Sequence, residues 1–118
     1  MKLNYEALRQ VMIEMQNQPP RPSESTIVSN VVKKGFSQND AVYSLKQAID
    51  AGLIDGSVKT DFSNTYYFDL RDITPAGHQF IDSILEDTYW NKVKTVIKEE
   101  GIPVTIPSIT RTIAKLFL

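Results

Sequence analysis

The sequence lacks several residue types on which common functional sites depend. Its 118 residues include no cysteine, one histidine and one tryptophan. The absence of cysteine excludes disulfide bonds and thiolate zinc sites. No run approaches about 18 consecutive apolar residues, so no transmembrane helix is predicted. The N-terminus, Met1–Glu6, lacks the apolar core of a signal peptide. We therefore expect a cytoplasmic protein with no membrane partner.

The chain offers little for catalysis. No glycine-rich phosphate loop is present, and no serine or carboxylate is placed by a motif to work with His78. A metal site would need two or more further ligands, and none has suitable spacing. We expect no enzyme activity, no metal and no cofactor. His78 is interpreted as part of the fold, with a general base as the weaker alternative.

Positive charge is also in short supply. Thirteen Lys and Arg residues against fourteen Asp and Glu give a net charge of −1. A dedicated nucleic-acid-binding protein more often has an excess of basic residues. Local clusters can still form a positive face, because only the docking surface meets phosphates. The charge lowers the expectation of DNA binding without excluding it.

The stretch from Ser37 to Thr74 organises the prediction. A helix is predicted from Ser37 to Ala51 and ends at Gly52, which suits a left-handed backbone. Leu53-Ile54 then begins a strand, with a bulge at Asp55-Gly56. A tip at residues 59–64 leads to a returning strand in which apolar and polar residues alternate from residue 65 to 71. A helix followed by such a hairpin is typical of a winged helix.

Helices are predicted on both sides of this stretch. Asn4 begins the first helix, which ends before Pro19-Pro20. The segment Thr26–Lys34 fits either a short helix or a strand, because its apolar spacing is helical but its residues are β-branched. The helix is favoured. A later helix begins at Thr74-Pro75 and buries the apolar residues Phe80, Ile81, Ile84 and Leu85.

The expected fold is α+β and mainly α. It is a winged helix-turn-helix with a two-stranded wing and a C-terminal helical extension, in one domain over residues 1–118. Residues 1–72 form the winged-helix part and residues 74–118 form the C-terminal helices.

Two groups of residues are candidates for binding. Polar and basic residues on the predicted helix, the turn before it and the wing suit base edges and phosphates of DNA. They are Gln38, Asn39, Tyr43, Lys46, Gln47, Lys33, Lys34 and Lys59, and Ser44 is predicted on the same exposed face. The alternative is an ordinary solvated surface.

The second group comes from the apolar C-terminal helices. These residues could pack within the domain, which is favoured for Trp90, or form a homodimer interface. They are Trp90, Ile109, Ile113, Leu116 and Phe117.

Several short runs resemble a family of small bacterial and prophage proteins of unknown function. The runs are Gly35-Phe36-Ser37, Ala51-Gly52-Leu53-Ile54, Thr74-x-x-Gly77-His78-x-Phe80 and Trp90 with Lys94. The resemblance covers most of the chain and implies a winged-helix-like fold without an established activity. The family often has histidine at the position of Ser44 and tryptophan at that of Pro75. The segment before Gly35 is usually more strand-like in the family.

Two functions are weighed. The leading hypothesis is a non-enzymatic winged-helix protein that binds duplex DNA as a phage or prophage regulator. The alternative is a phage accessory protein that docks on a host protein. Near-neutral charge and the wing aromatics Phe62, Tyr66 and Tyr67 favour that alternative, because protein interfaces are enriched in aromatic residues.

Overall fold

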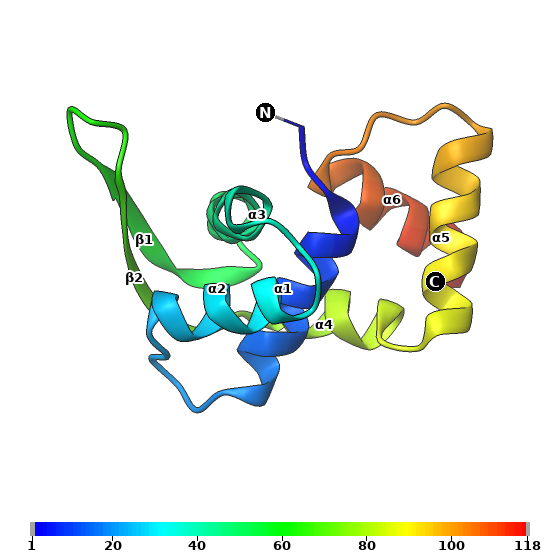
Figure 1. Cartoon of the computed structure of the whole chain (residues 1–118). Helices are drawn as coiled ribbons and strands as arrows, with labels where there is room; N and C mark the ends of the chain where they lie inside the picture. Colours follow the sequence, from blue (N-terminus) through cyan, green and yellow to red (C-terminus); the bar gives the residue numbers. More distant parts are fainter. Residues whose placement is uncertain (1, 118) are drawn as a thin grey trace.

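The computed structural model describes residues 2–117, and these form six helices and a two-stranded antiparallel sheet (Figure 1). In chain order the elements are α1 (Tyr5–Asn17), α2 (Glu24–Lys33), α3 (Gln38–Asp50), β1 (Ile54–Thr60), β2 (Tyr66–Ile73), α4 (Pro75–Ile84), α5 (Asp87–Glu99) and α6 (Ile106–Phe117). The prediction of an α+β, mainly helical fold is confirmed. Three helices followed by a hairpin are compatible with a winged helix.

The ambiguous segment Thr26–Lys34 is helical, as favoured. It forms most of α2. Ser23 caps this helix, and its hydroxyl accepts a hydrogen bond from the Thr26 N–H at 3.2 Å. Ile27 and Val31 are fully buried on the face that packs against the core. Burial of this helical stripe outweighs the strand preference of the β-branched residues, because tertiary packing supplies most helix stability.

The hairpin follows the predicted alternation. Tyr66 and Phe68 are half-buried and Leu70 is buried on one face, while the residues between them are exposed. The register shifts between Asp55 and Gly56, the predicted place, but the pairing skips Arg71, so the extra residue is on β2 and not on β1. The tip is shorter than residues 59–64, because Lys59 and Thr60 still belong to β1 and pair with β2.

Three hydrogen bonds form a junction that holds the end of α3, the start of β1 and the start of α4 together. The Thr74 hydroxyl accepts a hydrogen bond from the Gly77 N–H at 3.0 Å and donates to the Gly52 carbonyl at 2.6 Å. The Thr74 N–H donates to the Leu53 carbonyl at 3.1 Å. A Cβ atom at residue 77 would overlap that same carbonyl oxygen. The junction therefore requires glycine at this position.

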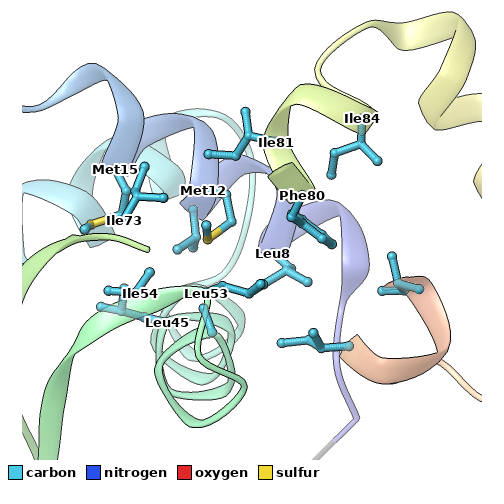
Figure 2. Packing of buried hydrophobic residues seen from close by; sticks show 14 of the residues in the cluster. Leu8, Met12, Met15, Leu45, Leu53, Ile54, Ile73, Phe80, Ile81 and Ile84 are labelled. Atoms are coloured by element: carbon cyan, nitrogen blue, oxygen red, sulfur yellow. The ribbon is translucent and has the colours of Figure 1, made fainter. Parts of the chain in front are cut away.

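Buried side chains from both parts of the chain form one core (Figure 2). Leu8 and Met12 of α1 lie in the same cluster as Leu45 of α3 and as Phe80 and Ile81 of α4. The described residues before and after residue 73 thus contribute to the same core. Leu85, which we predicted to be buried, is 48% exposed, because α4 ends at Ile84 and the turn carries the next side chain outward.

A polar clamp connects α1 to α5. Trp90 is 1% exposed, and its indole N–H lies 3.1 Å from each carboxylate oxygen of Glu6. The Lys94 ammonium group is 2.6 Å from the same carboxylate. Tyr5 packs edge-on against the indole ring, with ring centres 5.8 Å apart. The only tryptophan of the chain is therefore buried inside the domain, with a hydrogen-bond partner for its indole N–H.

Arg9 completes the clamp. Its guanidinium donates to the carbonyls of Ile84 at 3.0 Å and Leu85 at 2.7 Å, and it pairs with Asp87 at 2.8 Å. It also lies 5.7 Å from the centre of the Trp90 ring. One α1 side chain thus satisfies carbonyls that the end of α4 leaves without helical partners.

We expect Gly77→Ala to lower the free energy of unfolding by about 3 kcal/mol, because the new methyl group meets the rigid Leu53 carbonyl. Urea denaturation followed by circular dichroism measures this. Gln79→Ala, at an exposed position of the same helix, is the control and should change stability by less than about 0.5 kcal/mol. Equal stability of the two variants would show that the backbone around Leu53 shifts to accommodate the methyl group without cost.

Candidate functional site

Helix α3 lies between the hairpin on one side and the N-terminal segment on the other (Figure 1). Its inner face, which includes Ala41, Leu45 and Ala48, is fully buried. On the side away from the hairpin, Tyr43 and Gln47 line an open hollow of about 800 Å³ together with Lys2-Leu3 and residues 102–107. The outward side of α3 therefore forms one wall of this hollow.

The predicted DNA-binding residues fall into three places. Gln38 and Asn39 are exposed in the first turn of α3, and Tyr43, Lys46 and Gln47 are half-buried farther along it. Lys33 and Lys34 are exposed at the end of α2, and Lys59 is exposed on β1. Ser44, which we predicted on this face, is instead fully buried, and its hydroxyl has no hydrogen-bond partner among the described residues. It lies with Ala41 and Ala48 on the inner side of the helix.

The lysine in the middle of α3 is not free to meet phosphate. Its ammonium group is 2.8 Å from Asp50, one turn along the helix. The hydrogen bond that Lys46 donates to Asp50, with a smaller Coulombic contribution from the same carboxylate, raises the pKa of Lys46 above its ordinary value of 10.5. Asp40 accepts a hydrogen bond from the Asn4 amide at 3.3 Å. With two acidic residues and one lysine, α3 has a net charge of −1.

The hairpin is acidic as well. Four aspartates against one lysine and one arginine give residues 54–73 a net charge of −2. The charged residues are Asp55, Asp61, Asp69 and Asp72 with Lys59 and Arg71. Tyr67 is 58% exposed on the outer face. This surface would repel phosphate rather than attract it.

Asp61 organises the tip of the hairpin. One carboxylate oxygen accepts hydrogen bonds from the N–H groups of Ser63 at 2.8 Å and Thr65 at 3.0 Å, and the other accepts from the Tyr67 hydroxyl at 3.0 Å. Asn64 adopts a left-handed backbone with φ of 59°. The turn leaves the side chain of Phe62 fully exposed. A bulky apolar group thus projects into solvent from a well-bonded turn.

The acidity of Asp61 gives this turn a pH dependence. The hydrogen bond from the Thr65 N–H, followed by those from the Tyr67 hydroxyl and the Ser63 N–H, lowers the pKa of Asp61 below 3.8, its ordinary value. A lowered pKa means that the carboxylate supports the turn at neutral pH and that this support is lost as pH falls through the folded-state value. The amide signals of Ser63 and Thr65 should therefore shift together in NMR spectra, with a midpoint below 3.8. Asp61→Asn should abolish this titration, and a midpoint above that value would contradict the assignment.

The predicted interface residues divide into two sets. Trp90, Ile109 and Ile113 are buried inside the chain, so they are not available to a partner. Leu116 is 37% exposed, and Phe117 is half-buried with its ring 5.0 Å from that of Tyr89. Only the end of α6 offers apolar surface of the predicted kind.

His78 is exposed on α4 beside an open hollow that Asp82 and Tyr89 also line. Among the described residues its imidazole makes no hydrogen bond, and the nearby Ser83 hydroxyl donates to the Gln79 carbonyl. Within residues 2–117 no group of three or more His, Asp or Glu side chains is arranged to hold a metal ion. The geometry thus places no activated nucleophile beside His78.

Residues 2–103 match the model of a protein family described as "Hypothetical protein (DUF2513)". The chain belongs to this family. The matched region extends from the N-terminal segment through α5, so it contains α3 and the hairpin but not α6. An uncharacterized protein of Haemophilus influenzae is 29% identical over 114 residues, which covers 92% of this chain and 89% of the relative. No solved structure is significantly similar to this DUF2513 chain.

The match agrees with the expected membership in a family of unknown function, and it assigns no activity. None of the helices in the described residues is both long and apolar enough to cross a membrane. Sequence reasoning missed the ordered turn at Asp61 and the clamp around Trp90. The spacing Asp61-x-Ser63 was a usable signal for the turn, because aspartate side chains often accept a hydrogen bond two residues on.

Proposed function

We propose that this chain is a non-enzymatic winged-helix protein that binds duplex DNA through the first turn of α3 and the end of α2. The proposal rests on two amide side chains at the start of α3. The amides of Gln38 and Asn39 are exposed in that turn and make no side-chain hydrogen bond within the described residues. Amide side chains match the donor and acceptor pair on the major-groove edge of adenine.

The surroundings of this turn favour DNA binding more than the rest of α3 and the hairpin do. Lys33 and Lys34 are exposed immediately before it, where they can reach phosphates on either side of a groove. The recognition helix of a helix-turn-helix protein also contacts bases with its N-terminal residues. The acidic pair partner Asp50 lies at the opposite end of α3. Contact limited to the N-terminal half of α3 avoids Asp50, and Asp40 in the first turn is half-buried and hydrogen-bonded to the Asn4 amide.

Binding should be weak and moderately salt-dependent. Two phosphate contacts from Lys33 and Lys34 predict a slope of about −2 when log K is plotted against log salt. Fluorescence anisotropy with a mixed-sequence duplex, between about 50 and 200 mM salt, measures the slope. The double variant Lys33→Ala/Lys34→Ala should lose most of the salt dependence. Lys92→Ala/Lys98→Ala, on the exposed side of α5, is the matched control and should keep it. Absence of binding at the lowest salt would refute the proposal.

Asp50→Asn changes the charge at the opposite end of α3 and should act on DNA binding through the electrostatic field around the helix. The substitution removes one negative charge and frees the Lys46 ammonium group, while α3 loses an acid from a helix end where acids are unfavourable. DNA affinity should rise severalfold at low salt. A protein partner that docks on the distant hairpin tip should be unaffected.

A second candidate function is docking of a protein on the hairpin. It is favoured by the fully exposed Phe62 on an ordered turn, since preorganised aromatic side chains are frequent anchors at interfaces. Asp61 beside it and the net negative charge of the hairpin suit an apolar pocket surrounded by Lys or Arg residues. A single buried Phe contributes about 2 to 3 kcal/mol.

This candidate is tested by photocrosslinking from position 62. A photoreactive phenylalanine at this position identifies the neighbouring protein in cells, and the purified partner is then titrated with the wild-type chain. Phe62→Ala should weaken the affinity by about 30-fold, whereas Val32→Ala, at an exposed apolar residue on α2, should not. Equal affinity of the Phe62→Ala variant would rule out the anchor.

A further inference from the structure

A separate apolar cleft lies between α4 and α6, next to the end of α3. Its volume is about 440 Å³, within the range of small-molecule sites in proteins. The floor consists of four buried apolar side chains, namely Leu53, Phe80, Ile106 and Ile113. Ala76 on α4 and Ala114 on α6 lie along its sides and leave the space between the helices unfilled.

The lining indicates the chemistry of an occupant. No charged side chain lines the cleft, so an ionised ligand would lose hydration without gaining an ion pair. The neutral polar groups at the rim include the Gln79 amide and the Thr110 hydroxyl. Neither side chain makes a hydrogen bond within residues 2–117. These groups can bind one hydroxyl or carbonyl of a ligand whose remaining surface is apolar.

One side of the cleft is formed by the segment that connects α3 to the hairpin. Ala51 and Leu53 line it, and the Leu53 carbonyl accepts the hydrogen bond from the Thr74 N–H at 3.1 Å. A ligand packed on Leu53 therefore touches the segment in which α3 ends and β1 begins. Such a ligand would stabilise the observed conformation of this junction, since it binds only where the cleft is formed.

We propose that the cleft between α4 and α6 is a binding site for a small, uncharged amphiphile, and that occupancy stiffens the junction between α3 and the hairpin. Any effect on DNA would rest on the proposed function of α3. Binding of the amphiphile itself does not.

The probes are 1-octanol, octanoate and octylammonium, which share an alkyl chain and differ in charge. We expect saturable binding of octanol by isothermal titration calorimetry or NMR, with octanoate and octylammonium at least tenfold weaker. In hydrogen exchange, the Thr74 amide should exchange more slowly when octanol is bound. The measurements use the full chain without DNA, so failure of the DNA proposal leaves their outcome unaffected.

Two variants fill the cleft from α6. Thr110→Leu and Ala114→Leu each place a larger apolar group at an exposed helix position, so the fold is expected to be kept. Each should reduce octanol affinity at least tenfold. Thr95→Leu, at an exposed position on α5 outside the cleft, is the matched control and should bind octanol like the wild-type chain.

Three outcomes would overturn the proposal. The first is no saturable binding of octanol, and the second is equal binding by the Thr110→Leu variant. The third is a concentration-dependent dimer, seen by light scattering, that Thr110→Leu abolishes. That result would show that a second copy of the chain covers the cleft.

Discussion

The clamp around Trp90 is the interaction on which the arrangement of the two parts depends. The indole N–H donates to Glu6, and Arg9 from the same helix lies near the indole ring and satisfies the carbonyls that end α4. Both acidic and basic partners come from α1, one turn apart. Because α1 also lies in the shared core with α3, the clamp holds the C-terminal helices against the part of the chain that presents α3 and the hairpin.

The surface of α3 and the hairpin has two chemically distinct regions. The first turn of α3 and the end of α2 present uncommitted amides and exposed lysines. The hairpin presents aspartates and a fully exposed phenylalanine. One region suits phosphates and base edges, and the other suits an apolar pocket with a basic rim.

Local sequence signals predicted most of the elements. Capping residues such as Ser37 and Thr74 and the stop at Gly52 act through the neighbouring backbone, so their effect can be read over a few residues. The segment Thr26–Lys34 shows the limit, because β-propensity and helical spacing conflicted there and packing against the core decided. Leu85 was wrongly predicted as buried, since the direction of a side chain just past a helix end depends on how the next turn leaves it.

The candidate site was predictable only as a list of residue types. The sequence by itself determined most of the helices, the hairpin and the near-neutral charge, because these depend on local backbone preferences and composition. The tertiary structure decided that Ser44 is buried and that Trp90 belongs to the core. It also decided where the cleft between α4 and α6 lies. These properties depend on contacts between residues far apart in the chain or on the rotation of a helix against its neighbours, which residue spacing alone does not determine.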